Sequence, residues 1–519
     1  MEIAIHGQSK WVSVTRRPWL LFAVFSVVFS ILISPSLKVP FERDEGEYAH
    51  AADLLLGGRL PYRDTFLQKP PGIFLIYAGI FLTLGSGFVA VHVGLLLNYL
   101  AVGWLLYLLG KRIGGPSAGL WAAGLFYLSL FMPLYQSFAA NTEAFMILPI
   151  CAAMLLLWDA RERPAAWRCA LIGLLFGFGI FIKQTAVFQG LQIGILLLFI
   201  GTEWKVRLRN LALFGMCAAI PFGICLAWYA AAGALPQFLD CVLWHNLEYR
   251  GQSFEATGLS EIRRALSTLQ PMDMIVWVAA MIWLIAAAIT WRRTGWAAWF
   301  IGGWLLAAAM GISVGGYYRG HYFIQALPPL CLGCALALRA GPRYQPAGVL
   351  LVVAAWILAQ PWLFSKTIEQ QSKERYWQSI RFVNAVTIGD WLKAHDVKTL
   401  YILGSEPELY HYSHATAVSR YVISNPLFGG YQTSRQRQEE VFRAVSSHKP
   451  DAIIVSYGGF TPVFEHSDFW LFQQIQPLLE KSYAPVAYCT EQAAGLQEIT
   501  PRGLDTALRE FDLIIYLKR

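Results

Sequence analysis

Long apolar runs recur through the first 365 residues of the chain. A helix that crosses a bilayer needs about 20 consecutive, mostly apolar residues. The runs predict about eleven such helices, although several fall short of this length. Their approximate ranges are 19–39, 87–110, 117–133, 143–158, 169–182, 185–201, 210–232, 273–290, 296–312, 323–338 and 346–364.

Two further segments predict helices that lie along a membrane surface. The apolar run Ile73–Leu82 follows Pro70-Pro71-Gly72 and is too short to span. The connection over about 233–272 mixes aromatic and basic residues, as in Trp244, Tyr249 and Arg250, which is typical of an interfacial helix.

The pattern changes after residue 365, where charge rises and the apolar runs shorten. Runs rich in branched and aromatic residues predict β-strands at Thr399–Leu403, Arg420–Ile423, Ala452–Val455 and Leu513–Leu517. Amphipathic spacing predicts helices at Glu369–Ala394, Arg435–Ser447 and Trp470–Lys481. The predicted fold is therefore an α-helical polytopic membrane module, residues 1–365, followed by a soluble α/β domain, residues 366–519.

Composition supports a membrane protein. The 519 residues are 56% hydrophobic and 14% charged, whereas a soluble protein carries about 25% charged residues. Placing the N-terminus in the cytoplasm makes every cytoplasmic connection basic, as the positive-inside rule requires. The C-terminal domain then lies outside the cytoplasm. The net charge of +8 follows from this topology and from attraction to anionic lipid, and it does not indicate nucleic-acid binding.

An acidic cluster follows the first predicted span. Four acids stand within six positions, at Glu42, Asp44, Glu45 and Glu47. Neighbouring carboxyls can have different roles: one can act as a base while another binds a metal or a hydroxyl group. If this segment is helical, Asp44, Glu47 and Tyr48 share one face by their spacing.

The predicted topology brings other polar residues to the same side of the membrane. They come from loops and helix ends that are distant in sequence, which predicts a single site: Arg63, Lys69, Glu143, Lys183, Arg319, His321 and Tyr322. Basic residues can hold a phosphate leaving group, and an acid can take the proton of an attacking hydroxyl. Such a mixture suits a lipid-phosphate headgroup offered to a hydroxyl nucleophile.

Two motifs carry a family resemblance. Arg43-Asp44-Glu45-Gly46-Glu47-Tyr48-Ala49 is followed some twenty residues later by Gln68-Lys69-Pro70-Pro71-Gly72. This combination resembles the GT-C glycosyltransferases of the protein-mannosyltransferase and aminoarabinose-transferase superfamily. Further elements fit the bacterial branch: Asn141-Thr142-Glu143, Lys183-Gln184-Thr185, His321-Tyr322-Phe323 before Leu327-Pro328-Pro329, and Gly404-Ser405-Glu406-Pro407-Glu408 with Arg420-Tyr421 and Asn425-Pro426.

The resemblance implies a hexosyl- or pentosyltransferase of the bacterial inner (plasma) membrane that inverts the anomeric carbon. Its donor would be a polyprenyl-phosphate-linked sugar, and its acceptor a hydroxyl group of a glycolipid, glycan or protein on the outer face. By matching position, Asp44 would be the catalytic base, with Glu45 beside it, and Lys69 would touch the donor phosphate. The remaining candidates for substrate binding are Glu47, Tyr48, Arg63, Glu143, Lys183, Arg319, His321 and Tyr322.

One position departs from the family pattern. Members that modify lipid A often carry Glu before the motif Lys, whereas Gln68 stands here. This departure leaves open both a metal contact at this position and specificity for aminoarabinose. A divalent metal held by Glu45 or Glu47 is an open alternative, and no His/Cys spacing supports a zinc site.

Simpler explanations exist for several of these residues. Asp44 and Glu45 could cap a helix, Glu143 could cap the fourth span, and Lys69 or Lys183 could snorkel to the interface. Two other functions compete with the transferase. One is a transporter or flippase for lipid-linked sugars, although no internal repeat is visible. The other is a membrane scaffold whose C-terminal domain binds partners.

Overall fold

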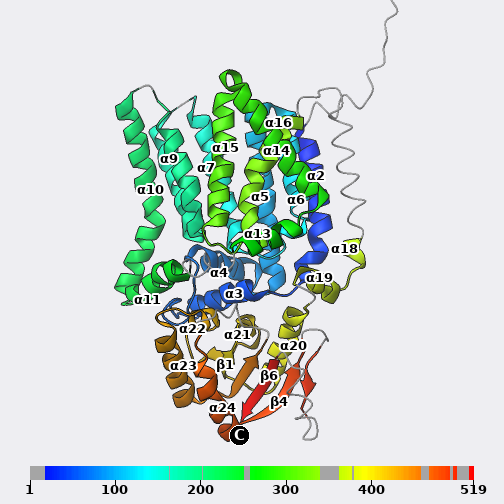
Figure 1. The fold of residues 1–519 in the computed structure, drawn as a ribbon, viewed down its shortest axis with the longest axis vertical. Coiled ribbons are helices and arrows are strands. Elements are labelled where there is room, and N and C mark those ends of the chain that lie inside the picture. Colours follow the sequence, from blue (N-terminus) through cyan, green and yellow to red (C-terminus); the bar gives the residue numbers. More distant parts are fainter. Residues whose placement is uncertain are drawn as a thin grey trace, which may run out of the picture.

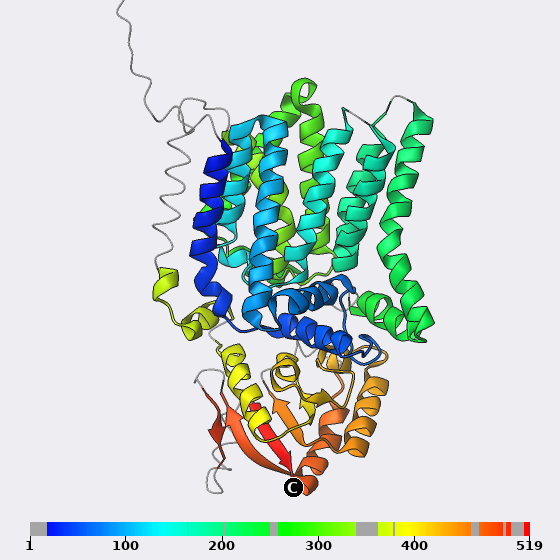
Figure 2. The same ribbon diagram turned by 180° about the vertical axis from the view of Figure 1, so that it is seen from behind.

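The computed structural model describes residues 18–162, 164–201, 203–249, 258–338, 362–376, 379–457, 467–490, 495–499 and 513–519. These residues form three layers (Figure 1). Long upright helices make a bundle, shorter helices lie across one end of the bundle, and a sheet domain sits beyond them. The same order of layers is seen from behind in Figure 2.

Among the described residues, the bundle contains ten helices that coincide with the first ten predicted spans. They are α2 (Pro18–Ile33), α5 (Phe88–Gly114), α6 (Pro116–Ser129), α7 (Thr142–Ala160), α8 (Ala166–Ile182), α9 (Val187–Leu197), α10 (Trp204–Ala231), α14 (Pro271–Ile289), α15 (Trp291–Ser313) and α16 (Leu327–Leu338). Among the described residues, six apolar helical segments are long enough to cross a membrane. The predicted helical membrane fold is confirmed, whereas the predicted number of about eleven spans is not. The eleventh, 346–364, lies largely outside the described residues.

Large apolar side chains cover the outer faces of this bundle. On α10, Met216 and Ile224 are 64% and 66% exposed, and on α14 Ile289 is 80% exposed. The inner helix α7, by contrast, is mostly buried among its neighbours, and none of its residues is exposed. An apolar outer face around a packed interior is what a lipid environment requires, since lipid tails satisfy no polar group.

The cross layer contains the segments that carry most candidate residues. Its main helices are α3 (Arg43–Leu56) and α4 (Gly72–Leu84), which lie across the end of the bundle (Figures 1 and 2). The α4 helix contains the apolar run predicted as a surface helix. The second connection predicted to hold such a helix contains α13 (Gly258–Ser267), which also lies across the bundle end in Figure 1. Short elements complete the layer: η1 (Ser34–Lys38), η2 (Pro133–Tyr135), η3 (Gln184–Ala186), α11 (Leu235–Leu239), the π-helix η4 (Asp240–Trp244), η5 (Gly320–Ala326), α18 (Trp362–Ser365) and α19 (Ile368–Arg375).

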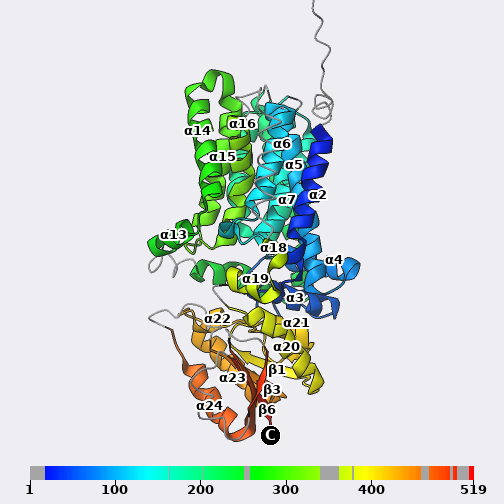
Figure 3. The same cartoon turned by 90° about the vertical axis from the view of Figure 1, so that its right-hand side faces the viewer.

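The C-terminal domain is built on a mixed six-stranded sheet, seen from the side in Figure 3. The strands are β1 (Thr399–Leu403), β2 (Thr416–Ala417), β3 (Ala452–Ser456), β4 (Tyr483–Cys489), β5 (Gln497–Glu498) and β6 (Leu513–Lys518), in the order β2-β1-β3-β6-β4-β5. Strands β2, β1 and β3 are parallel, and β6, β4 and β5 are antiparallel. The helices are α20 (Arg381–Ala394), α21 (Glu408–Ser413), α22 (Asn425–Phe428), α23 (Ser434–His448) and α24 (Trp470–Ser482).

Two predictions for this domain were wrong. The segment Arg420–Ile423 is not a strand, because it is bound to the cross layer instead of to the sheet. The carbonyl of Arg420 accepts a hydrogen bond of 2.6 Å from the backbone N–H of Phe66. The predicted helix Glu369–Ala394 is two helices, α19 and α20. The predicted boundary after residue 365 stays a prediction.

The sheet domain is docked tightly on α3. A Cβ atom built on Gly46 would lie 2.5 Å from the backbone nitrogen of Glu408, the first residue of α21. Beside this contact, Arg43 Nε donates to the Ser405 carbonyl at 2.6 Å, and His411 lies 2.6 Å from the Asp53 carboxylate. Glycine at position 46 therefore lets two helices from distant parts of the chain meet at backbone distance.

Replacing Gly46 by alanine is expected to destabilise the protein by about 1–3 kcal/mol, because the added methyl group meets backbone that cannot move aside. The control is Gly79→Ala on α4, where an added Cβ meets nothing within 4 Å. Thermal unfolding of both purified variants checks the prediction, and equal unfolding temperatures would contradict it.

Candidate active site between the bundle and the sheet domain

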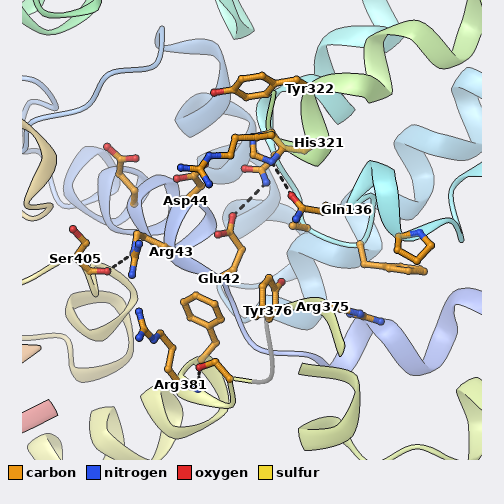
Figure 4. A pocket seen from close by; sticks show the side chains of 18 of the residues that line it. Glu42, Arg43, Asp44, Gln136, His321, Tyr322, Arg375, Tyr376, Arg381 and Ser405 are labelled. Carbon is orange, nitrogen blue, oxygen red and sulfur yellow. Dashed lines mark hydrogen bonds between the residues drawn. The ribbon is translucent and has the colours of Figure 1, made fainter. Parts of the chain in front are cut away.

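A cavity of about 650 Å³ lies where the three layers meet (Figure 4). Its walls come from α3, the loop before α4, the segment between α6 and α7, the segment around η5, α19 and the loops of the sheet domain. The cavity is large enough for a sugar-phosphate headgroup, since ligand pockets measure about 300–1,000 Å³. Of the predicted site residues, six line it: Asp44, Glu47, Lys69, Arg319, His321 and Tyr322.

Asp44 stands in the first turn of α3 and is half-buried at the cavity wall. The helix begins here because Glu42 donates its backbone N–H to the Glu45 carboxylate at 3.0 Å, and because acids in a first turn favour the positive helix end. Within the described ranges, the Asp44 carboxylate has no hydrogen bond or ion pair of its own. It is therefore available to a ligand.

The two acidic residues that line the cavity beside Asp44, Glu42 and Glu47, have raised pKa values. Burial, aided by repulsion from Asp44, raises the pKa of Glu47 to about 8, although Lys69 opposes the shift. Burial likewise raises the pKa of Glu42, with Asp44 and Glu45 adding to the effect. Glu47 thus favours its neutral form near pH 7, in which it can donate a hydrogen bond.

Glu45 does not line the cavity. Its carboxylate points into the bundle, where Oε1 accepts from His92 Nε2 at 2.8 Å and from the Ala140 backbone N–H at 2.7 Å. The side chain is buried, and it ties α3 to α5 and to the segment before α7. This geometry favours a structural role for Glu45, unlike the role that the sequence predicted.

Lys69 reaches the cavity from the loop before α4. Burial disfavours its ammonium, but Asp44, Tyr322 and Glu47 outweigh this and raise its pKa, so the side chain stays charged. Its backbone is fixed by the Tyr62 hydroxyl, which donates to the Lys69 carbonyl at 2.7 Å. A charged, anchored ammonium at a cavity wall is suited to hold an anion.

The segment around η5 supplies the opposite wall. Arg319, His321 and Tyr322 all line the cavity, and His321 Nδ1 lies 3.3 Å from the Gln136 amide oxygen. The labelled side chains of Asp44, His321 and Tyr322 lie close together in Figure 4. Residues far apart in sequence are thus brought to one cavity.

Glu143 and Lys183 form a buried ion pair directly behind this wall and do not line the cavity. The Lys183 ammonium donates to the Glu143 carboxylate, which also accepts from the Thr142 hydroxyl at 2.7 Å. Lys183 Nζ also lies 4.1 Å from the centre of the Tyr322 ring. The pair therefore supports Tyr322 from behind and does not itself face a ligand.

Two other predicted residues lie away from the cavity. Tyr48 is fully buried and packs edge-on against Tyr77, with ring centres 5.7 Å apart. Arg63 is exposed and pairs with its neighbour Asp64 at 3.0 Å. Neither is positioned to touch a ligand in the cavity.

Several cavity residues were not predicted from the sequence. They are Glu42, Arg43, Gln136, Tyr249, Arg375, Arg381, Ser405 and Asn425, among others. Ser405 and Asn425 belong to motifs that the sequence singled out, but those motifs were assigned to the C-terminal domain alone. Arg375 is the last residue of α19 and Arg381 the first of α20, and both line the cavity.

The sequence left open a divalent metal held by Glu45 or Glu47. In the part of the chain that the structure describes, no group of three His, Cys, Asp or Glu side chains gathers as metal ligands would. Glu45, one of the two suggested ligands, is engaged by His92 and Ala140.

Two comparisons of sequence find proteins that are similar to part of this chain. The family described as dolichyl-phosphate-mannose-protein mannosyltransferase matches residues 68–228. An undecaprenyl phosphate-α-4-amino-4-deoxy-L-arabinose arabinosyl transferase of Pseudomonas fluorescens is 26% identical over 244 residues, which cover 44% of this chain and 41% of that protein.

Solved structures share the fold over almost the whole chain. ArnT from Cupriavidus metallidurans bound to undecaprenyl phosphate matches with a TM-score of 0.63 at 14% identity, covering 98% of both chains. An Archaeoglobus fulgidus oligosaccharyltransferase in complex with Zn and sulfate matches with a TM-score of 0.51 at 11% identity, covering 92% of this chain and 72% of that one. The chain is thus similar in sequence to the mannosyltransferase family over residues 68–228, and it shares its fold with ArnT over almost its whole length.

Proposed function

We propose that this protein transfers a sugar from a polyprenyl-phosphate donor to a hydroxyl acceptor, with Asp44 as the general base. The observation that carries the proposal is the meeting of an unengaged carboxylate, Asp44, with a charged Lys69 in one cavity. The acceptor oxygen attacks the anomeric carbon, the bond from that carbon to the phosphate oxygen breaks, and Asp44 takes the acceptor proton. Attack opposite the leaving phosphate inverts the anomeric carbon.

The phosphate end of the donor is assigned to the cationic wall. Lys69 and Arg319 lie on the same cavity as Asp44, and both can stabilise the negative charge that grows on the leaving phosphate. The leaving group departs as a stable anion, so the site needs no acid to protonate it. The neutral carboxyl of Glu47 can donate a hydrogen bond to a sugar hydroxyl group.

The charge pattern and the relatives support the proposed membrane setting. Basic connections favour a cytoplasmic N-terminus, which puts the cavity and the sheet domain on the outer side of a bacterial inner membrane. Undecaprenyl phosphate occurs in the name of the similar transferase, and the ArnT structure has it bound. The proposed donor lipid is therefore undecaprenyl phosphate, and the acceptor is a hydroxyl group of a glycolipid, glycan or protein.

Lys69→Ala is expected to weaken binding of undecaprenyl phosphate by about tenfold or more, because a charge-assisted contact to phosphate is worth roughly 1.5–3 kcal/mol. The purified full-length variant in lipid nanodiscs can be titrated with undecaprenyl phosphate. The control is Arg59→Ala, which removes an exposed cation that lies outside the cavity. Equal affinity of the Lys69 variant and the wild type would contradict the phosphate assignment.

A further inference from the structure

The part of the cavity at the end of α19 carries polar groups that the proposed mechanism does not use. Arg375 is the last residue of α19, Tyr376 follows it, and both line the cavity. In Figure 4 the Tyr376 side chain lies between those of Glu42 and Arg375, on the side of Glu42 away from Asp44. The two residues thus belong to a part of the cavity beyond the proposed base.

The Arg375 guanidinium has hydrogen-bond donors to spare. A guanidinium carries five N–H groups, two of them on Nη2. Nη2 donates to the Ser36 hydroxyl at 2.7 Å and to the Gln371 amide oxygen at 3.0 Å. Among the described residues, neither Nε nor Nη1 has a hydrogen bond or an ion pair. The N–H groups of these two nitrogens are therefore available to a ligand.

The guanidinium is also held in one place. Its central carbon lies 4.3 Å from the centre of the Phe138 ring, and Ser36 and Gln371 hold Nη2. Burial lowers the pKa of Arg375 to about 10, so the side chain stays protonated near pH 7. A fixed, planar fork of donors is preorganised to bind two neighbouring oxygen atoms of one ligand.

Tyr376 offers a second unused group. Its ring packs edge-on against Phe382, with ring centres 4.8 Å apart. Its hydroxyl makes no hydrogen bond to any part of the chain that the structure describes. A phenol hydroxyl can both donate and accept, so it suits a ligand that carries hydroxyl groups.

The charges around Arg375 disfavour an anionic ligand. The carboxyls of Glu45 and Glu374 already act on the Arg375 charge, and Glu374 and Glu42 both line the cavity. A phosphate group would bring further negative charge beside these carboxyls. A neutral sugar ring meets no such repulsion, and its hydroxyl oxygens can accept from the guanidinium.

The geometry of the proposed reaction assigns this part of the cavity to the acceptor. The acceptor attacks opposite the leaving phosphate, which is assigned to Lys69 and Arg319. The Lys69 charge is stabilised by Asp44 and Tyr322, which are not among the groups that act on Arg375. Arg375 is therefore remote from the phosphate and lies where the acceptor has to enter.

We propose that Arg375 and Tyr376 form an acceptor subsite for a neutral sugar, in which the guanidinium and the phenol hydroxyl bind hydroxyl groups of the ring. The inference rests on the proposed function and narrows its acceptor to a hydroxyl group carried by a sugar. It also gives α19 a role in the choice of acceptor.

The first test uses Tyr376→Phe, which removes only the hydroxyl group. The probes are the methyl glycosides of glucose, galactose, mannose and N-acetylglucosamine, and saturation-transfer NMR measures their binding to the full-length protein in nanodiscs with undecaprenyl phosphate bound. The wild type is expected to bind at least one probe. Tyr376→Phe should bind that probe about three- to tenfold more weakly, the usual contribution of one neutral hydrogen bond.

The same variant should otherwise behave as the wild type. Its unfolding temperature and its affinity for undecaprenyl phosphate should be unchanged, because the hydroxyl has no partner among the described residues. The matched control is Tyr457→Phe, which changes an exposed tyrosine of the sheet domain outside the cavity and should leave all three measurements unchanged.

The second test uses Arg375→Lys, which keeps the positive charge but loses the planar fork. Glycoside binding should fall about tenfold or more, and inorganic phosphate should not compete with the glycoside on the wild type. Competition by phosphate that Arg375→Lys retains would identify an anion site and overturn the inference. Unfolding temperatures show whether this variant is folded, and Tyr376→Phe carries the test if it is not.

Three other results would count against the subsite: no binding of the four glycosides by the wild type, equal glycoside affinity of Tyr376→Phe and the wild type, or weaker binding of undecaprenyl phosphate by Tyr376→Phe. Lys69→Ala tests the proposed function separately. If Lys69→Ala loses affinity for undecaprenyl phosphate while Tyr376→Phe binds glycosides normally, the subsite is wrong and the proposed function stands. If Lys69→Ala keeps that affinity, the placement of the phosphate is wrong.

Discussion

Asp44→Asn is expected to lower the rate of sugar transfer by about 10²–10⁴-fold, the usual contribution of a general base. The substitution keeps the size of the side chain and removes its ability to take the acceptor proton. Because the Asp44 carboxylate makes no hydrogen bond or ion pair within the described residues, folding and binding of undecaprenyl phosphate should remain close to wild type. Transfer can be followed by mass spectrometry of glycolipids and glycoproteins from a deletion strain that expresses each variant.

The neighbouring acid provides the matched control. Glu45→Gln replaces a carboxylate that accepts hydrogen bonds from His92 and the Ala140 backbone. It should lower the unfolding temperature, because one buried acceptor becomes a donor that meets other donors. Asp44→Asn should leave that temperature unchanged. Full transfer activity of the Asp44 variant would refute its assignment as the base.

Lys183→Met should cost about 3–5 kcal/mol of folding free energy, because it leaves the Glu143 carboxylate buried without its partner. Glu143 is completely buried, and its remaining side-chain donor is the Thr142 hydroxyl. The variant should also lose transfer activity, since the Tyr322 ring loses the ammonium behind it. Denaturant or thermal unfolding in detergent measures the stability.

The double variant Lys183→Met/Glu143→Gln tests the cause. Removing both charges should recover most of the stability, because no uncompensated charge is left in the bundle. Lys393→Met, which breaks an exposed pair with Asp390, should cost less than about 1 kcal/mol. A single Lys183 variant as stable as the wild type would contradict the structural role of the pair.

The layers of the fold differ in how far the sequence predicts them. Membrane helices were predictable because each contains its own apolar run, which is a local signal. The break between α19 and α20 was not, because the amphipathic pattern continues across it. The segment Arg420–Ile423 has the composition of a strand, yet a tertiary contact to Phe66 holds it elsewhere.

For the site, the sequence could predict which residues gather. Loops that alternate between the two sides of the membrane, assigned by their basic residues, predict that one side holds Asp44, Lys69, Arg319, His321 and Tyr322. The structure puts all five on one cavity.

The direction in which each side chain points could not be predicted from the loop pattern. Successive helix residues point about 100° apart, so Asp44 faces the cavity and Glu45 faces the bundle. Glu143 and Lys183 looked available for a ligand because nothing in the sequence shows that they neutralise each other.

The glycine contact between α3 and α21 limits how this protein can be recombined or can diverge. Gly46 leaves no room for a side chain against Glu408, so the two surfaces have to be inherited as a matched set. A chimera that takes its C-terminal domain from a relative would bring a foreign α21 against the helix that bears Asp44. Grafts should therefore exchange residues 41–56 together with the domain, and natural variation on either surface should be accompanied by compensating change on the other.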